Sequence, residues 1–181
     1  MWRRKNWEDG SIMEKIYRNY LEIKFLDQLV EKKKPNNNFK LEKIFKSDFQ
    51  LNKFFYKQIG KNHNWNERLA WNDSKWIEYV NSPNVLTFVL KNNEDIAGFF
   101  ELINHEDKFE MELAYFGLLE EYLYKNLGGY MLSEAIKISF SYKIKRVWVH
   151  TCSLDHKNAL NNYLSRGMKI YNTEIINLKS A

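Results

Sequence analysis

The order of the predicted elements places this sequence in the α/β or α+β class, with helices packed on the faces of a mixed sheet. Two short alternating segments read as early strands, and two helical segments follow them. Three further apolar strands, joined by short polar turns, predict an antiparallel meander. A helix, a strand, a second helix and a last strand complete the order. The 181 residues fit one sizeable core, so we predict a single domain over residues 1–181.

Residues 1–38 are predicted to be an N-terminal extension, or an additional strand or helix of the domain. Residues 1–19 are polar with interspersed aromatic side chains, which fits a short helix or a partly ordered arm. Within residues 20–30, the segment YLEIKFL alternates with a period of two, as a strand does. EKKKPNNN then predicts a loop, and FKLEKIF, residues 39–45, a second strand.

Two helices are predicted next, separated by a polar loop that carries several aromatic residues. Ser47 and Gln50 form a capping-box pattern at the start of the first helix, and Gly60 ends it. Asn72 or Asp73 caps the second helix, which a Ser-Pro pair ends.

The second half of the sequence alternates strands and helices with clear boundaries. The expected elements are strands over 85–90, 96–103 and 108–119, a helix from Leu127, a strand over 146–152, a helix capped by Asp155 and ended by Gly167, and a last strand over 168–175.

Composition and charge limit the classes of function. The net charge is +5 and the isoelectric point is near 9.1, but the lysines are scattered apart from one run of three, so nucleic acid is not expected as a partner. No apolar run reaches the roughly 20 residues of a membrane span, and no apolar segment follows the charged N-terminus as in a signal peptide. The single cysteine, Cys152, allows neither an internal disulfide nor a zinc site, which suits the cytoplasm.

The stretch from Phe109 to Leu132 joins an apolar strand, a polar loop and a helix that opens with Gly128 and Gly129. Glycine at a helix N-terminus favours anion binding, because unpaired N–H groups and the helix dipole point outward there. The alternative is a helix start without a ligand.

The loop in this stretch reads LYKNLGG over residues 123–129. It resembles the Gln/Arg-x-x-Gly-x-Gly/Ala motif of the GCN5-related N-acetyltransferases, the GNAT family. Leu123 and Asn126 depart from that motif, at its polar residue and at its first glycine. Asn tolerates a left-handed backbone better than other residues with a side chain, so the loop can still fold.

A second motif lies in the C-terminal strand-helix-strand unit. Ala159, Tyr163 and Gly167 have the spacing of the Asn-x-x-Ala-x-x-x-Tyr-x-x-x-Gly-Phe motif of the same family, with Met168 in place of Phe. His156 stands at its Asn position, with an asparagine two residues on. The two motifs agree in order and distance, and the resemblance covers roughly residues 39–175.

The resemblance implies both a fold and an activity. The fold would be a GNAT-like mixed, mainly antiparallel central sheet with helices on both faces, splayed between its two central strands. The activity would be transfer of an acetyl group from acetyl-CoA, the co-substrate, to a primary amine by direct attack in a ternary complex, without a metal. The alternatives are a non-catalytic module of this fold that binds acyl-CoA or another protein, and a basic nucleic-acid-binding domain.

The resemblance implies a small-molecule or peptide amine as the acceptor. The sequence is also compatible with a homodimer, and we expect no membrane partner. In the family, the pyrophosphate of coenzyme A lies at the glycine-bearing helix start, and the preceding strand pairs its backbone with the pantetheine arm. Gly117 in that strand predicts a bulge or a close backbone approach, or merely a bend. The residues implied to contact the coenzyme are Phe116, Leu118, Tyr124, Lys125, Asn126, Leu127, Gly128, Gly129, His156 and Asn158.

Two residues are expected to carry the chemistry. Glu112 lies in an apolar strand, where a carboxylate is costly unless it is paired or solvated by a cleft, so it is a candidate general base, directly or through water; a salt-bridged surface residue is the alternative. Simple alternation places Tyr115 with Leu113 on one face and Phe116 with Glu112 on the other. Tyr163 matches the family tyrosine that donates a proton or hydrogen bond to the departing sulfur; a core tyrosine is the alternative.

The loop between the first two helices shapes the acceptor pocket in the family. We therefore expect His63, Trp65 and Trp71 to contact the acceptor, with Glu67 beside them; packing at the domain edge is the alternative. His150 titrates near neutrality and is a candidate base or substrate ligand, with a structural role as its alternative.

Overall fold

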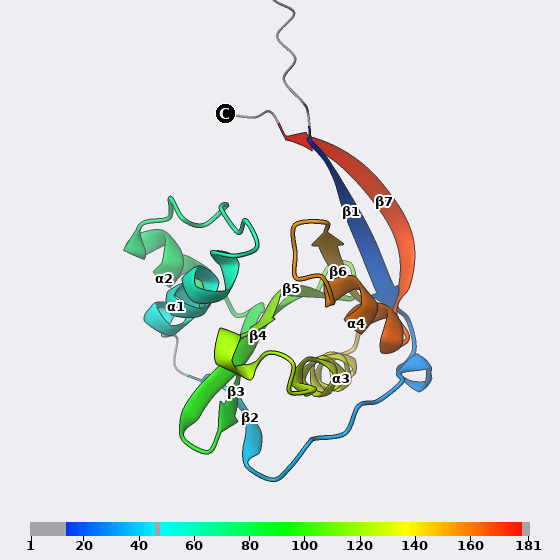
Figure 1. Cartoon of the computed structure of the whole chain (residues 1–181), viewed down its shortest axis with the longest axis horizontal. Helices are drawn as coiled ribbons and strands as arrows, with labels where there is room; N and C mark the ends of the chain where they lie inside the picture. Colours follow the sequence, from blue (N-terminus) through cyan, green and yellow to red (C-terminus); the bar gives the residue numbers. More distant parts are fainter. Residues whose placement is uncertain (1–13, 46–47, 179–181) are drawn as a thin grey trace, which may run out of the picture.

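A seven-stranded sheet forms the centre of the fold, in the order β2-β3-β4-β5-β6-β1-β7 (Figure 1). The computed structural model describes residues 14–45 and 48–178. Neighbouring strands pair antiparallel except β5 and β6, which pair parallel. The strands are β1 (Glu14–Ile23), β2 (Phe39–Lys43), β3 (Val85–Asn92), β4 (Asp95–His105), β5 (Glu110–Leu118), β6 (Arg146–Cys152) and β7 (Lys169–Leu178). The helices are α1 (Phe49–Gly60), α2 (Asp73–Asn81), α3 (Leu127–Phe140) and α4 (Ala159–Ser165), with short 3₁₀ turns at Leu26–Gln28 and Glu120–Tyr122.

Helices cover both faces of this sheet, which confirms the predicted class. α1 and α2 lie together on one face and α3 on the other (Figure 1). Phe55 of α1 stacks on Phe99 of β4, with ring centroids 4.8 Å apart. Leu127, Met131 and Leu132 of α3 are buried in the same hydrophobic core as the strands. Burial of such side chains is the main favourable term in folding, so these contacts fix the two layers on the sheet.

The predicted helices are confirmed, and two of their caps differ. The Asn72 side chain accepts from Lys75 N at 2.9 Å, as expected for an N-cap. Ser47 lies outside the described residues, and it is Asp48 that caps α1, accepting from Leu51 N. Asp155 was expected to cap the last helix and does not, because α4 begins only at Ala159.

The first strand differs most from its prediction. β1 runs from Glu14 to Ile23, so it begins earlier and ends earlier than the strand expected over YLEIKFL, residues 20–26, and the prediction for residues 1–13 lies outside the described part of the chain. It is inserted between β6 and β7, pairing antiparallel with both. Residues 14–17 pair with β7 alone, so the two strands extend together past the end of β6 (Figure 1).

A bulge in β5 reverses the predicted alternation of its side chains. Leu113 pairs with Leu102 and Tyr115 with Glu101, which leaves Ala114 without a partner on β4. Tyr115 therefore lies on the face of α1 and α2, opposite to Leu113, and the expectation that the two share a face is wrong. The bulge occurs before Gly117, which instead allows a close approach: a Cβ there would lie 2.6 Å from Cγ2 of Ile59.

Candidate active site

The site opens where β5 and β6 separate. The two strands pair only from Glu110 to Glu112, against Arg146 to Trp148. Beyond that point β5 stays paired with β4 through Leu118, and β6 stays paired with β1 through Cys152. A cavity of about 670 Å³ lies between the separated segments and is lined by both of them. The free backbone edge of β5 therefore faces this cavity.

One end of the cavity is positively charged. Asn126 has φ 61° and ψ 18°, the left-handed backbone predicted for it, and turns the chain into α3. Gly128 and Gly129 follow at the first turn, and Lys32 and Arg166 line the cavity at the same end. A Cβ at Gly128 would meet only the side-chain amide of Asn162, at 3.5 Å. The free backbone N–H groups at this helix start and the two cationic side chains are donors suited to a pyrophosphate. The absence of a side chain at Gly128 lets the pyrophosphate approach the backbone.

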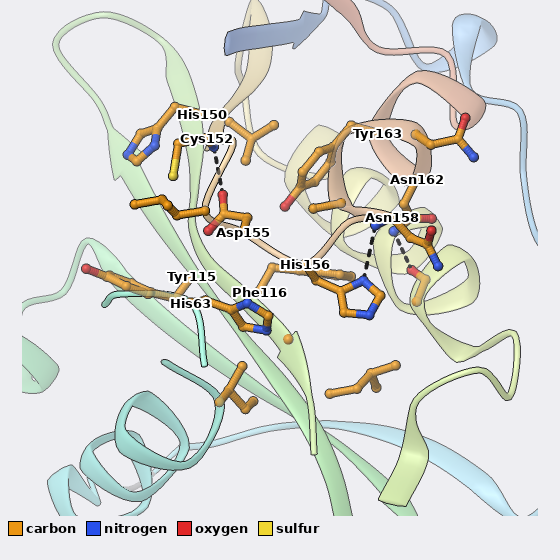
Figure 2. A pocket seen from close by; sticks show the side chains of 18 of the residues that line it. His63, Tyr115, Phe116, His150, Cys152, Asp155, His156, Asn158, Asn162 and Tyr163 are labelled. Atoms are coloured by element: carbon orange, nitrogen blue, oxygen red, sulfur yellow. Dashed lines mark hydrogen bonds between the residues drawn. The ribbon is translucent and has the colours of Figure 1, made fainter. Parts of the chain in front are cut away.

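Tyr163 of α4 lies in the middle of the site. Its side chain is only 6% exposed and its ring centroid is 6.3 Å from that of Phe116 on β5. Figure 2 shows its hydroxyl directed into the cavity. Burial, and then the charge of Asp155, raise the pKa of this hydroxyl, so it stays protonated at neutral pH. Such a group can give a hydrogen bond or a proton to a leaving group.

The other end of the cavity carries a carboxylate, an imidazole and an arginine. The Tyr115 hydroxyl donates to Glu67 Oε2 at 3.0 Å, and the ring of Trp65 meets Tyr115 edge to face at 4.9 Å. His150 lies on β6 in the same wall, open to the cavity (Figure 2). Burial, and then the charge of Arg18 on β1, lower the pKa of His150, so its imidazole is neutral at physiological pH.

Two histidines from different loops lie side by side in the cavity lining. His63, from the loop after α1, and His156, from the loop after β6, have ring centroids 6.0 Å apart (Figure 2). Nδ1 of His156 accepts from the backbone N–H of Asn158 at 3.2 Å. The Tyr124 hydroxyl lies 3.5 Å from its Nε2. Burial, and then the charge of His63, lower the pKa of His156.

Most of the residues singled out from the sequence come together around this one cavity. Those that line it are His63, Trp65, Glu67, Phe116, Leu118, Tyr124, Asn126, Leu127, Gly128, Gly129, His150, His156, Asn158 and Tyr163.

Three of them lie elsewhere. Glu112 is on the paired part of β5, outside the cavity lining, with its Oε2 2.8 Å from Nε2 of His105. Its charge still raises the pKa of His150, so it lies within electrostatic reach of the cavity. Lys125 places its ammonium over the ring of Tyr122. Trp71 packs beside Trp76, with ring centroids 5.2 Å apart.

The sequence did not reveal a buried ion pair behind the Tyr115 wall. Glu101 of β4, fully buried, accepts from Arg68 Nη1 at 2.9 Å and from the Tyr79 hydroxyl at 2.7 Å. The Arg68 guanidinium carbon lies 4.0 Å from the ring centroid of Tyr79 and 4.1 Å from that of Tyr115. This network fixes the back of the Tyr115 ring. The sequence did offer one indication of this pair: Glu101 is a carboxylate within the apolar run IAGFFELI, and a buried carboxylate needs a partner.

Arg18 was also missed. It becomes part of the site only because β1 pairs with β6, which places Arg18 opposite Cys152. No local pattern in the sequence shows which strand β1 will join. The thiol of Cys152 lines the same wall, and burial raises its pKa, so it stays protonated.

Within the described residues, no group of three or more His, Cys, Asp or Glu side chains is arranged to hold a metal ion. None of the helices formed by residues 14–45 and 48–178 has the length and apolar character needed to cross a bilayer.

Comparison with known proteins agrees with this fold. The family model described as "Acetyltransferase (GNAT) family" matches residues 40–168, which is more than half of the chain. The chain belongs to this family. The comparison with curated proteins found no match.

Solved structures share the fold at low sequence identity. A GCN5-related N-acetyltransferase from Kribbella flavida has a TM-score of 0.64 at 11% identity, over 88% of this chain and 56% of its own. A second, from Sphaerobacter thermophilus, has a TM-score of 0.63 at 11% identity, over 88% of this chain and 50% of its own. This chain thus spans about half the length of these two proteins. An aminoglycoside acetyltransferase from an uncultured soil metagenomic sample has a TM-score of 0.60 at 13% identity, over 74% of this chain and 90% of its own.

Proposed function

We propose that this protein transfers an acetyl group from acetyl-CoA to a primary amine by direct attack in a ternary complex. The observation that carries the proposal is the cavity between β5 and β6, which joins a cationic helix start at one end to a Glu67–Tyr115–His150 wall at the other, with the Tyr163 hydroxyl between them. Family membership supports the use of acyl-CoA. The acceptor is a small-molecule or peptide amine, and a cytoplasmic location stays a prediction.

The residues divide the binding between them. The first turn of α3, with Lys32 and Arg166, holds the phosphates of coenzyme A. The free edge of β5 from Leu113 to Leu118 offers backbone N–H and C=O groups to the pantetheine arm, as to an added strand. Holding both reactants in one cavity supplies much of the rate, because the attack becomes effectively unimolecular.

Tyr163 and His150 move the protons. As the amine nitrogen attacks the thioester carbonyl carbon and the C–S bond breaks, Tyr163 donates its proton to the sulfur. His150, held neutral by its surroundings, accepts the proton that the amine loses. Glu112, the base expected from the sequence, lies outside the cavity lining, so we assign it an indirect part: its negative charge favours the protonated form of His150.

Two measurements test the proposal together. Calorimetry should detect acetyl-CoA binding, and a thiol-release assay with a panel of amines should detect turnover. Failure to bind at millimolar acetyl-CoA contradicts the proposal. Binding without thiol release for any amine would favour the non-catalytic acyl-CoA-binding module instead.

Tyr163→Phe tests the assigned proton donor. Turnover should fall by about 100-fold with little change in acetyl-CoA affinity, since general acid catalysis contributes about that much. Tyr130→Phe is the matched control, because Tyr130 is buried but does not line the cavity. Equal turnover in the two variants would remove Tyr163 from the mechanism.

A further inference from the structure

An arginine on β1, Arg18, faces the acceptor end of the cavity. Ile16 and Arg18 are two residues apart on β1 and therefore lie on the same face of the strand, and both line the cavity. The Arg18 Nε is buried and has no hydrogen-bond partner. Among residues 14–45 and 48–178, no carboxylate forms an ion pair with this guanidinium. A partly buried cation without a counter-ion is costly, and a bound anion would compensate it.

The acidic groups around Arg18 are all engaged elsewhere. Glu174, its cross-strand neighbour on β7, accepts from the Tyr20 hydroxyl at 2.9 Å. Asp155 accepts from Thr151 Oγ1 at 2.7 Å and from the backbone N–H of Cys152 at 2.8 Å. Glu67 accepts from Tyr115. These contacts hold the carboxylates in place and leave the guanidinium available for a ligand.

The same wall offers a counterpart for the amine. Glu67 is a carboxylate that lines the cavity, and it suits an incoming ammonium group before its proton is lost. His150 lies in the wall with it and is close enough to Arg18 for the arginine charge to act on its imidazole. The cationic residues at the α3 end, Lys32 and Arg166, are occupied by coenzyme A in the proposed reaction. Of the arginine and lysine residues that the described part of the chain places on the cavity wall, Arg18 is therefore the one left for the acceptor.

We infer that the acceptor is an amine that also bears a carboxylate, with the carboxylate bound by Arg18 and the amine placed between Glu67 and His150. The inference rests on the proposed acetyl transfer and narrows its substrate class. A guanidinium fork matches a carboxylate in geometry and charge, and such charge-assisted bonds are among the stronger ones in proteins. An amine without an anionic group would leave Arg18 uncompensated in the ternary complex.

Pairs of amines that differ in charge and hardly in shape test the inference. Glycine, 4-aminobutyrate and 6-aminohexanoate are each compared with their primary amides, which replace the carboxylate by a neutral group of the same size. Their lengths sample three separations between Arg18 and the reacting amine. For at least one pair, kcat/KM of the wild type should favour the carboxylate by about tenfold or more, the factor for one good interaction. The ratio should fall as salt is added.

Substitution of Arg18 should remove this preference. In Arg18→Met the carboxylate and its amide should react alike, mainly through a higher KM for the carboxylate, and Arg18→Lys should restore part of the ratio. Arg166→Met is the matched control: it should weaken acetyl-CoA binding and keep the carboxylate-to-amide ratio. Circular dichroism melts establish that each variant is folded.

The outcomes separate this inference from the proposed function. If acetyl-CoA binds and the wild type acetylates amides as well as carboxylates, the inference is overturned and the acetyl transfer stands. Sisomicin, a polyamine without a carboxylate, extends the panel, and acetylation of it in preference to every amino acid would also overturn the inference. If no amine is acetylated, calorimetric binding of 6-aminohexanoate against its amide decides: equal affinity in wild type and Arg18→Met overturns it, and a preference lost in Arg18→Met supports it.

Discussion

Arg68 and Arg18 both lie next to the walls of the cavity, and they differ in whether their charge has an ion-pair partner among the described residues. Arg68 is 6% exposed, bonds Glu101 at 2.9 Å and lies between two aromatic rings. Arg18 has a buried Nε without a partner and borders the cavity. The first charge is compensated within the fold, so it holds the Tyr115 wall in position. Within residues 14–45 and 48–178 the second has no ion-pair partner, so solvent or a ligand is left to compensate it.

The largest expected effect comes from breaking the compensated pair. Glu101→Ala leaves the Arg68 guanidinium buried without its carboxylate, and the free energy of unfolding should fall by about 3–5 kcal/mol. Chemical denaturation measures it. Arg68→Met combined with Glu101→Leu should recover most of this loss, because no unpaired charge then remains. A single variant as stable as the wild type would show that the pair carries no such role.

The second effect tests whether the ring of Tyr115 or its hydroxyl matters to Arg68. Tyr115→Phe keeps the ring over the guanidinium and removes the bond to Glu67, so stability should fall by about 1 kcal/mol. Tyr115→Leu removes the ring as well and should cost clearly more. Equal melting temperatures for the two variants would mean that the ring contributes nothing to holding Arg68.

The third effect is a shift in the pKa of His150, which should have opposite signs in two variants that each remove one nearby charge. The pKa of His150 is lowered first by burial and then by Arg18, and it is raised by Glu112, Asp155 and Glu67. Arg18→Met removes a lowering charge, so this pKa should rise. Glu112→Gln removes a raising charge, so it should fall. Burial, the largest cause, remains in both variants, so the two shifts differ in sign while this pKa stays lowered by burial.

NMR titration of the His150 ring measures these shifts directly. If His150 is the proton acceptor, the rising limb of the pH–rate profile should move in the same directions, to higher pH in Arg18→Met and to lower pH in Glu112→Gln. Shifts of the same sign in both variants would contradict the electrostatic account of this wall.

The smallest effect completes the comparison of the two arginines. Arg18→Met should leave the free energy of unfolding unchanged or raise it slightly, because an uncompensated, partly buried charge is removed and no ion pair among the described residues is lost. Denaturation beside the Glu101→Ala variant measures it under the same conditions. A loss as large as that of Glu101→Ala would show that Arg18 is structural and not reserved for a ligand.

The sequence predicted what local patterns encode. The helices, the meander and the left-handed Asn126 follow from capping, spacing and backbone preference within a few residues. The motif around Tyr163 led to the residue at the centre of the cavity. The resemblance added the splayed sheet, which no local pattern marks.

The remainder depends on contacts between distant residues. The bulge at Ala114 turns Tyr115 to the other face, and nothing in the strand itself marks that position. Arg68 and Glu101 are 33 residues apart, so their pairing is visible only in the fold. In the sequence, Glu112 fitted a carboxylate in a cleft and a paired surface residue equally well. Its contact with His105 is visible only in the structure, because the alternation of side chains along a strand does not show which residues pair across strands.

The position of β1 also affects how the site assembles. Tyr20 on β1 and Glu174 on β7 are 154 residues apart and hydrogen-bond across the ladder. During synthesis β1 leaves the ribosome well before β6 and β7, the two strands that pair with it. Its backbone groups therefore stay unpaired until those strands have been made. Pairings of such high sequence separation form slowly. The wall that bears Arg18 is therefore expected to be completed late in folding, after the meander of β3, β4 and β5 has formed from contacts near in sequence.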